Sequence, residues 1–576
     1  MERTSRRVVV VGGVAGGMSA AARLRRLDEH AEIIVLEQDD YVSFANCGLP
    51  YHIGGEIADR GALLLQTPAS LAESLALDVR TGHEVTAIDR AAKQVRVLDR
   101  ATGRAYQERF DRLVLATGAA PLKPRLPGVD HPRIFTLRSI PNMDAIKAVV
   151  DSGARSAVVV GGGYIGLEIA EAFRYRGLEV TLVEAAEHVM AVLDAEMSSE
   201  IEDHLEANGV RLHLATTAQG FAAGPDDSVV VDLGEAGSAV ADLVVMAVGV
   251  RPESALASAA GLETDDRGAI VVNEHQQTSD PAIYAVGDAV LVRDTVTGEC
   301  IVVPLAGPAN RQGRIAADHI VRGGGRSARY TSTQGTGVVK VFEMTAAMTG
   351  ANEKALQRVG RPYGKVYLHP SGHATYYPGT APMHVKVLFD PADGRVLGAQ
   401  AAGWDGVDKR IDVFAVAIRA GMTVEDLEEL ELAYAPPYGS AKDPVNMAGF
   451  QAANVIRGDL RLWHADEWER LPPNALILDV RSPEEHARWC LPGSTLIPLK
   501  QLRARLAELP KDRPIYAYCR SGFRSYLAYR LLAQSGHDVR SLSGGELTFR
   551  AVHRGRPKGI RTQAETAYAE DLTAGA

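Results

Sequence analysis

The chain has 576 residues, of which 46% are hydrophobic and 23% are charged. This length is several times that of a typical domain, and the composition is that of ordinary globular proteins, which excludes disordered, collagen-like and coiled-coil classes. Acidic residues outnumber basic residues by 72 to 62, and no block of lysine and arginine stands out, so no nucleic-acid partner is expected. No stretch approaches the roughly 18 apolar residues that span a bilayer, so no membrane partner is expected either.

The cysteines of the chain are few and widely spaced. They are Cys47, Cys300, Cys490 and Cys519. A disulfide scaffold or a zinc site needs cysteines at short, regular spacings, so we expect neither a disulfide framework nor a metal site, and the pattern indicates a reducing compartment, the cytoplasm. Two arginines before an apolar run near the N-terminus also resemble an export signal. We interpret residues 8–11 instead as the first strand of a nucleotide-binding unit.

Residues 7–37 read as a strand, a glycine turn, an Ala-rich helix and a second strand, which is the pattern of a βαβ unit. The turn contains Gly12, Gly13, Gly16 and Gly17. Such a turn presents the N–H groups of a helix N-terminus to a pyrophosphate, and Glu37 at the end of the second strand would accept ribose hydroxyls. Val14 occupies the position at which the G-x-G-x-x-G fingerprint has its middle glycine.

The next segment of interest, residues 43–51 (SFANCGLPY), contains a single cysteine, Cys47. A single thiol forms no internal disulfide with a neighbour, so a redox role would make it alternate between a thiolate and a mixed disulfide, persulfide or sulfenic acid. A buried structural cysteine is the alternative interpretation.

A second βαβ unit follows at residues 158–184, and its glycine fingerprint is complete. The fingerprint glycines are Gly161, Gly163 and Gly166, and Glu184 ends the second strand of the unit. Two such units predict two different dinucleotides between which electrons pass. The alternative is that both glycine turns only pack helices against strands.

Three further apolar strands end in turns: residues 113–118 (LVLATG), 242–249 (DLVVMAVG) and 283–288 (IYAVGD). These motifs, in this order, resemble the two-dinucleotide flavoprotein family that includes glutathione reductase. The resemblance implies that Thr117 and Gly118 line an FAD site, and that Gly287 and Asp288 contact the ribityl chain of the flavin.

Residues 328–455 alternate strand-like runs with a helical stretch near 408–420, which predicts an α+β domain. In the resembled family this domain forms a homodimer and reaches the active site of the partner. The string around Cys47 resembles the coenzyme A-disulfide reductase branch, whose relatives include persulfide reductases and single-cysteine NADH oxidases and peroxidases. Peroxidase-type relatives carry a histidine in the first glycine loop, whereas residues 13–16 are Gly-Val-Ala-Gly here.

Tyr434 and Tyr438, in the string AYAPPYGSAKDPVN, match the paired tyrosines of the coenzyme A branch. The resemblance implies that their hydroxyl groups stabilise or protonate a leaving thiolate, and simple packing in a Pro-rich turn is the alternative. The resemblance also places six residues at positions that contact coenzyme A: Ser19, Arg23, Arg26, Ser43, Asn46 and Lys442. The two arginines are equally compatible with a solvated helix face, and residues 67–79 lack the basic residue expected for a coenzyme A site.

The C-terminal part of the chain, residues 476–548, resembles a rhodanese domain. Cys519 follows an apolar strand and opens the loop Cys-Arg-Ser-Gly-Phe-Arg, which includes Arg520 and Arg524. A loop that surrounds one sulfur with backbone N–H groups and cations stabilises a terminal sulfane anion. Phosphatases of related appearance use a loop that is one residue longer, so the shorter loop favours sulfur. We expect Cys300 and Cys490 to be structural.

Together these patterns predict an α/β protein with two Rossmann-like dinucleotide-binding domains, an α+β dimerisation domain and a C-terminal α/β rhodanese domain. The expected boundaries are 1–150 plus 251–327 for a discontinuous FAD-binding domain, 151–250 for an NAD-binding domain, 328–455 for the dimerisation domain, 456–474 for a linker and entry to the module, 475–560 for the rhodanese domain and 561–576 for a tail.

The resulting hypothesis is a homodimeric FAD enzyme that takes a hydride from NADH, or from NADPH as the alternative donor, and reduces a coenzyme A-linked disulfide, persulfide or polysulfide through Cys47. Glu184 favours NADH because a carboxylate there repels a 2′-phosphate. Cys519 would supply or accept sulfane sulfur. The alternatives are an NADH oxidase or peroxidase that cycles Cys47 through a sulfenic acid, and a redox-sensing flavoprotein whose rhodanese module docks partners.

Overall fold

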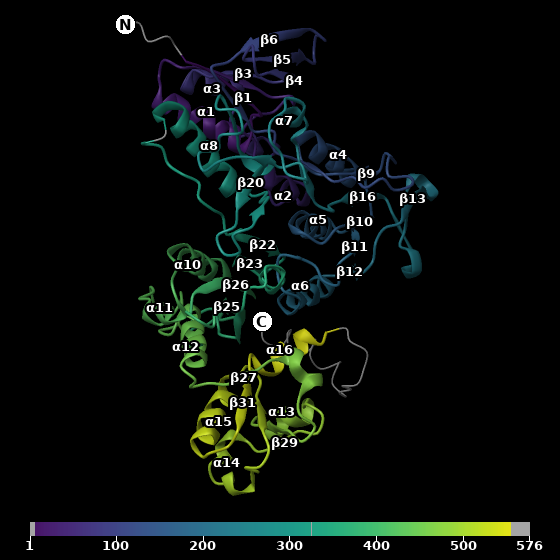
Figure 1. Ribbon diagram of the computed structural model, residues 1–576. Coiled ribbons are helices and arrows are strands. Elements are labelled where there is room, and N and C mark those ends of the chain that lie inside the picture. Colours follow the sequence, from purple (N-terminus) through teal and green to yellow (C-terminus); the bar gives the residue numbers. More distant parts are fainter. Residues whose placement is uncertain (1–5, 324, 555–576) are drawn as a thin grey trace. The chain divides into compact units, whose positions relative to one another are not determined.

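The computed structural model describes residues 6–323 and 325–554 (Figure 1). These residues form two compact units. Residues 6–190 and 205–335, apart from residue 324, make the first unit, and residues 191–204 and 336–554 make the second. The expected tail at 561–576, and the end of the expected rhodanese domain at 560, lie outside the described residues.

The first unit contains a parallel five-stranded sheet that joins distant parts of the chain. Its order is β19-β7-β1-β2-β3, with β1 at Arg7–Val11, β2 at Glu32–Leu36, β3 at Asp78–Arg80, β7 at Arg112–Leu115 and β19 at Ile283–Ala285. Helix α1 (Ala15–Leu27) packs on this sheet and against α8 (Ala306–Arg322). The central strands are mostly apolar because both faces of the sheet are covered, one face by α1 and α8 and the other mainly by residues of β5 (Gln94–Asp99), β18 (Ile270–Val271) and β20 (Val290–Arg293).

A second parallel sheet of the first unit has the order β12-β11-β10-β16-β9. Its strands are β9 at Ile134–Phe135, β10 at Ser156–Val160, β11 at Glu179–Val183, β12 at Val210–His213 and β16 at Leu243–Met246. Helix α5 (Tyr164–Tyr175) follows β10. The expected domain boundary at residue 150 differs from this arrangement, because Ile134 and Phe135 already pair with β16.

Smaller elements complete the first unit. The helices are α2 (Leu49–Gly54), α3 (Pro68–Leu75), α4 (Ile140–Asp151) and α7 (Ala255–Ala259). Two antiparallel sheets have three strands each: β4 (His83–Asp89), β5 (Gln94–Asp99) and β6 (Ala105–Arg109) form one, and β13 (Gly220–Ala223), β14 (Val229–Asp232) and β15 (Ser238–Ala241) form the other. Strand β8 (Ala119–Pro121) pairs with β17 (Val250–Pro252), and β18 (Ile270–Val271), β20 (Val290–Arg293) and β21 (Cys300–Ile301) form a further small sheet. Helix α6 (Ala195–Ala207) begins in the second unit and ends in the first.

The second unit begins with an antiparallel sheet of order β22-β23-β26-β25-β24. The strands are β22 at Gly337–Val341, β23 at Met344–Gly350, β24 at Gly364–Leu368, β25 at Met383–Phe389 and β26 at Val396–Gly403. Four helices accompany the sheet: α9 (Glu353–Arg358), α10 (Val407–Ala420), α11 (Val424–Glu429) and α12 (Pro444–Ile456). The helix predicted near 408–420 is α10, and the α+β class of this part is confirmed.

The C-terminal part of the second unit is a parallel sheet of order β27-β31-β30-β28-β29. The strands are β27 at Leu462–Trp463, β28 at Leu476–Asp479, β29 at Thr495–Leu496, β30 at Ile515–Tyr518 and β31 at Val539–Leu542. Three helices lie between these strands along the chain: α13 (Pro483–Arg488), α14 (Leu499–Leu502) and α15 (Phe523–Gln534). Helix α16 (Gly545–Val552) follows the last strand. Trp463 is fully buried, so the expected linker at 456–474 already contributes a strand and a core side chain to this domain. None of the helices in the described ranges has the length and apolar character needed to cross a bilayer.

Candidate functional site

The first glycine loop, between β1 and α1, is fixed by two glycines that have no room for a side chain. Gly12 has a φ of +102°, and a Cβ atom there would lie 2.2 Å from the Ala116 carbonyl oxygen. A Cβ on Gly17 would lie 1.9 Å from the Gly12 carbonyl oxygen. Val14 has a φ of −110°, which any L-residue adopts. The valine at the middle fingerprint position is therefore compatible with the turn.

The second loop, between β10 and α5, repeats this geometry. Gly161 has a φ of +110°, and a Cβ on Gly166 would lie 1.9 Å from the Gly161 carbonyl oxygen. Gly163 is extended, with a φ of −84°, and a Cβ there would meet no heavy atom within 4 Å. The open space in front of this glycine is what the close approach of a pyrophosphate to the backbone requires.

The two acids that end the second strands brace the two loops in the same way. Glu37 Oε2 accepts a hydrogen bond from Gly13 N at 2.7 Å, and Glu184 Oε2 accepts one from Gly162 N at 2.6 Å. Burial raises the pKa of Glu37, against the effect of its backbone N–H donors. Each carboxylate is thereby held at the strand end beside its glycine loop, the position from which an acid binds ribose hydroxyls.

The segment after β19 brings Gly287 and Asp288 to the same edge of the first sheet. Gly287 has a φ of +82° and donates its N–H to Gln312 Oε1 at 2.7 Å. Burial raises the pKa of Asp288 to about 6. Thr117 Oγ1 donates to the Glu253 carbonyl oxygen at 2.5 Å, next to Gly118. A half-buried carboxyl group of this kind suits a hydroxyl donor such as a ribityl chain, so these residues fit FAD.

Cys47 is exposed and lies in a short 3-10 turn at Asn46–Gly48, directly before α2. The Ser43 N–H bonds the Gly13 carbonyl oxygen at 2.8 Å, which fixes the cysteine segment to the first glycine loop. Partial burial raises the pKa of the Cys47 thiol, and the charges of Glu168 and Asp288 raise it further. These surroundings therefore disfavour the thiolate.

Glu168, on α5, is a residue that the sequence interpretation did not single out. Burial raises the pKa of this carboxyl to about 7, and Tyr51 donates a hydrogen bond to its Oε1 at 3.3 Å. Its charge acts on Cys47, although the two residues are 121 positions apart in the sequence. A glutamate within an amphipathic helix gives no local sign of this proximity.

The residues expected to contact coenzyme A divide into engaged and exposed groups. Ser19 Oγ bonds Asn310 Oδ1, and Arg23 forms an ion pair of 2.8 Å with Asp318, both across the contact between α1 and α8. The exposed residues are Arg26, Asn46 and Lys442, and Ser43 is half-buried. The ion pair gives Arg23 a role in helix packing, and all six positions stay predictions as coenzyme A contacts.

Tyr434 and Tyr438, the pair suggested by the sequence, both lie in the second unit, and their expected role at a leaving thiolate stays a prediction. Tyr434 is 47% exposed, and its hydroxyl lies 2.7 Å from that of Tyr376, which is 73% exposed. This hydrogen bond raises the pKa of Tyr376. Tyr438 is exposed as well, but no hydrogen bond joins its hydroxyl to Tyr434 among the described residues. Tyr376 was missed because 58 positions separate it from its partner.

Arg410, buried on α10, holds the two tyrosine-bearing loops together. Its Nη2 donates to the Gly372 carbonyl oxygen at 3.0 Å and to Asp443 Oδ2 at 3.0 Å. A backbone bond of 2.9 Å from Ala374 N to the Gly439 carbonyl oxygen joins the same two loops. The guanidinium thus fixes the distance between segments that are far apart in sequence.

Cys519 lies at the end of β30 and is 1% exposed. Its Sγ accepts a hydrogen bond from Gly522 N at 3.2 Å and one from Ser525 Oγ at 3.5 Å. Gly522 has a φ of +95°, which lets the loop curl around the sulfur. The Cys519 carbonyl oxygen accepts the Glu546 N–H at 2.8 Å, so the start of α16 supports the loop.

The two arginines of this loop have different surroundings. Arg524 forms a two-bond ion pair with Glu485, with contacts of 2.7 and 2.5 Å, and this pair holds the pKa of Glu485 at about 2. Arg520 is exposed. Cys300 is exposed on β21 and Cys490 is half-buried, and no disulfide is present among the described residues.

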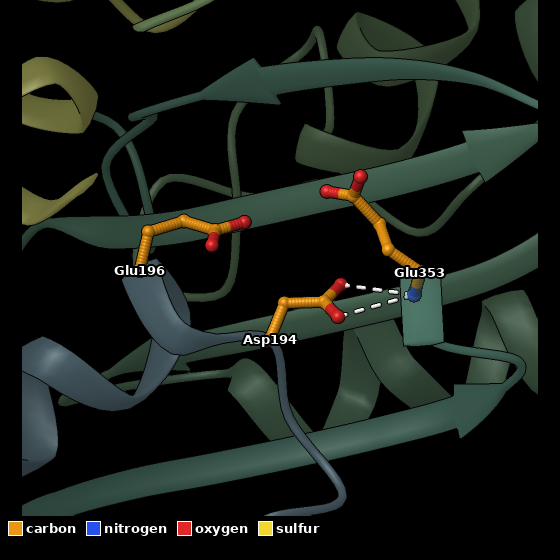
Figure 2. Close-up of side chains that lie close together, drawn as sticks. All are labelled: Asp194, Glu196 and Glu353. Carbon is orange, nitrogen blue, oxygen red and sulfur yellow. Dashed lines mark hydrogen bonds between the residues drawn. The ribbon is translucent and has the colours of Figure 1, made fainter. Parts of the chain in front are cut away.

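Three carboxylates of the second unit, those of Asp194, Glu196 and Glu353, lie close enough to hold a metal ion (Figure 2). Figure 2 shows Asp194 accepting the backbone N–H of Glu353. The ammonium of Lys386 bonds Asp194 at 2.6 Å and also bonds the two glutamates. Burial opposes this charge, but the neighbouring anions raise the pKa of Lys386 well above its usual range. The lysine therefore takes the place that a cation would occupy.

Comparison with known families accounts for most of the chain. Residues 6–329 match the pyridine nucleotide-disulphide oxidoreductase family, residues 336–444 match the dimerisation domain of that family, and residues 464–550 match the rhodanese-like domain. A coenzyme A disulfide reductase of Staphylococcus haemolyticus is 37% identical over 462 residues, which are 78% of this chain and all of that protein.

Two solved structures extend the similarity into the C-terminal domain. Reduced Bacillus anthracis CoADR-RHD is 45% identical, with a TM-score of 0.93, and the match covers 96% of this chain and 98% of that one. An NAD-dependent persulfide reductase from A. fulgidus is 38% identical, with a TM-score of 0.88, and covers 94% and 100% of the two chains. The predicted fold class, with two dinucleotide-binding domains, a dimerisation domain and a rhodanese domain, is confirmed.

Proposed function

Because the chain belongs to the pyridine nucleotide-disulphide oxidoreductase family, a family of FAD-dependent oxidoreductases, we propose that it reduces a coenzyme A-linked disulfide, persulfide or polysulfide at the expense of NADH. The observation that carries this proposal is the exposed Cys47 thiol on a segment that is hydrogen-bonded to the first glycine loop. One accessible sulfur beside the flavin-binding loop suits a mixed-disulfide or persulfide mechanism.

In this proposal Cys47 acts as the nucleophile. Its thiolate attacks an S–S bond of the substrate, a new S–S bond forms to Cys47 Sγ, and the old bond breaks with release of a thiolate or hydrosulfide. When bound, FAD supplies the two electrons of the nicotinamide hydride for reduction of sulfur at this site. A proton must reach the leaving sulfur, and a tyrosine hydroxyl that is already hydrogen-bonded to a second one is a suitable donor.

The tyrosines that we assign to this proton transfer are Tyr376 and Tyr434. The match of residues 336–444 to a dimerisation domain supports a homodimer. We assign the tyrosine pair of each subunit to the Cys47 of the other subunit. The exposure of both hydroxyl-bearing side chains supports this assignment, because a pair that served its own packing would be covered.

The C-terminal domain favours persulfide among the candidate substrates. Cys519 is enclosed by an N–H group and a hydroxyl that stabilise a sulfane anion, and we propose that it carries sulfane sulfur. Glu184 favours NADH as the donor because it stands where a carboxylate repels a 2′-phosphate. Four cysteines without a disulfide suit the reducing cytoplasm, where we place the reaction.

The decisive experiment measures NADH oxidation by the holoenzyme with coenzyme A disulfide, coenzyme A persulfide, polysulfide and oxygen as separate acceptors. We expect the persulfide to give the highest kcat/KM and oxygen the lowest. An NADH oxidase that cycles Cys47 through a sulfenic acid would show the reverse order. Turnover with none of these acceptors would favour the sensor function instead.

A further inference from the structure

Cys300, which we expected from the sequence to be structural, is exposed on β21. Strand β21 pairs with β20 in antiparallel fashion, and Cys300 lies opposite Arg293. An exposed thiol adds little packing to a core, so its reactivity is the property that needs an explanation.

Cys300 lines a pocket of about 260 Å³ in the first unit. Strands β18 and β20 supply another part of the wall, and the side chains from these strands and the residue after β18 are largely apolar: Val271, Val272, Leu291 and Val292. A largely apolar wall with a few polar groups is typical of a binding site for a small uncharged molecule. The pocket therefore places an accessible thiol at the edge of a space that suits such a molecule.

Two buried polar side chains of the same pocket lack a hydrogen-bond partner. Gln276 is 1% exposed and Tyr330 is 8% exposed, and both line the pocket. Among the described residues, nothing bonds Gln276 Oε1 or the Tyr330 hydroxyl. Buried polar groups without a partner are rare because they cost free energy, so they indicate a missing ligand or water.

The two unpartnered groups have complementary chemistry. The amide oxygen of Gln276 only accepts hydrogen bonds, whereas the hydroxyl of Tyr330 can donate one. A secondary amide offers one N–H donor and one C=O acceptor, so it can satisfy both groups at once. The pocket thus favours a ligand whose chain carries a secondary amide.

We propose that Cys300 is a site of reversible S-thiolation by a small uncharged thiol whose chain carries a secondary amide. The pocket holds the chain, Gln276 and Tyr330 bind the amide, and the mixed disulfide forms at Cys300. This modification is separate from the proposed reductase reaction, because it uses neither Cys47 nor Cys519.

The modifying step is an exchange with the symmetrical disulfide of that thiol, R–S–S–R. The Cys300 thiolate attacks one sulfur, a bond forms between that sulfur and Cys300 Sγ, and the S–S bond of the reagent breaks. One R–S group stays on Cys300, and the other leaves and takes up the proton that Cys300 lost. The Cys300 sulfur is oxidised, and the leaving sulfur is reduced by the same electron pair. Excess free thiol reverses the exchange.

The test treats the full-length holoenzyme, without NADH, with two uncharged disulfides. Pantethine carries secondary amides, and bis(2-hydroxyethyl) disulfide carries none. Peptide mapping by mass spectrometry follows the label on each cysteine over time, so that reaction at Cys47 is scored separately from reaction at Cys300. Each rate is divided by that of N-acetylcysteine with the same reagent, which removes the intrinsic difference between the reagents. We expect the normalised rate at Cys300 to be about tenfold higher with pantethine, the effect of two hydrogen bonds.

Two variants each remove one amide partner and keep most of the side-chain volume. Tyr330→Phe and Gln276→Met should each lower the pantethine rate at Cys300 about fivefold, the effect of one hydrogen bond. Neither should change the rate with bis(2-hydroxyethyl) disulfide. Tyr175→Phe, at an exposed position on α5, is the matched control and should change neither rate. Flavin content verifies that each variant is folded, and either variant alone suffices for the comparison.

Equal normalised rates for the two reagents at Cys300 of the wild-type protein would overturn the inference. A pantethine preference that survives unchanged in a folded Tyr330 or Gln276 variant would overturn it too. Label on Cys47 without label on Cys300 would also overturn it, and would leave the proposed reductase mechanism intact.

Discussion

Cys47 and Cys519 sit in opposite surroundings. Cys47 is exposed, and carboxylates together with partial burial raise the pKa of its thiol. Cys519 is buried, and an N–H group and a hydroxyl point at its sulfur. The first sulfur is accessible and belongs to a segment that is hydrogen-bonded to the first glycine loop, whereas the second is enclosed by donors that suit one extra sulfur atom. The difference teaches that one fold can give two chemically identical side chains opposite environments, and our proposal assigns electron transfer to the first and sulfur transfer to the second.

The largest expected effect comes from Cys47→Ser. NADH-driven reduction of coenzyme A disulfide should fall by about 10³-fold or more, because no other thiol can form the mixed disulfide beside the flavin-binding loop. The protein should stay yellow, since the glycine loops and Asp288 that fit FAD are intact. Steady-state NADH oxidation and the flavin spectrum measure both properties. Near wild-type turnover in this variant would end the single-thiol mechanism.

The converse variant, Cys519→Ser, should lose sulfur transfer from persulfide to cyanide by a similar factor of about 10³. Reduction of coenzyme A disulfide should stay within about twofold, because this freely diffusing substrate needs no sulfane carrier. Both assays are run on the same preparation, with flavin content and dimerisation as controls. Loss of disulfide reduction would show that the two cysteines belong to one cycle.

The tyrosine pair allows a sharper test of the Cys47 side of the comparison. Tyr376→Phe should lower kcat for disulfide reduction about 10²-fold, the usual contribution of a positioned proton donor. Tyr438→Phe is the matched control and should cost less than about threefold. The pH dependence of kcat should lose its alkaline limb only in the first variant. An equal loss of kcat in both variants would contradict the assignment of the proton transfer to Tyr376 and Tyr434 and would favour Tyr434 with Tyr438.

Glu184 tests whether only the Cys47 reaction depends on a nicotinamide. Glu184→Ala should improve kcat/KM for NADPH relative to NADH by about tenfold, because the repulsion of the 2′-phosphate is removed. Sulfur transfer through Cys519 should not change. A wild-type enzyme that prefers NADPH would show that the carboxylate does not face the ribose.

The smallest effect is expected for Glu168→Gln. Below pH 7 the Glu168 carboxyl is protonated, and the two proteins should react alike, since its pKa is about 7. Above pH 7 the wild-type carboxylate opposes ionisation of Cys47, so alkylation of the variant by iodoacetamide should be a few-fold faster, a shift of less than about one pKa unit. If the alkylation rate of the variant has the same pH dependence as that of wild type, the charge of Glu168 does not influence Cys47.

The sequence alone predicted both dinucleotide units, the fold class, the family and the two cysteines that differ so strongly. These features are local, because a glycine turn, an apolar strand or a Cys-Arg loop is determined by a short run of consecutive residues and their backbone preferences. For the same reason, the sequence shows that Val14 replaces the middle glycine of the fingerprint. The negative φ of Val14 shows why the turn accepts a valine there.

What the tertiary structure decided depends on pairs of distant residues. The partner of Tyr434 is Tyr376, the loops that carry them are joined by Arg410, and Ile134 and Phe135 belong to the second sheet. The charge of Arg524 is cancelled by Glu485, 39 positions earlier. Such contacts follow from how strands and helices pack rather than from any local pattern, so the identity of the cysteines was set by the sequence and their chemical environment by the fold.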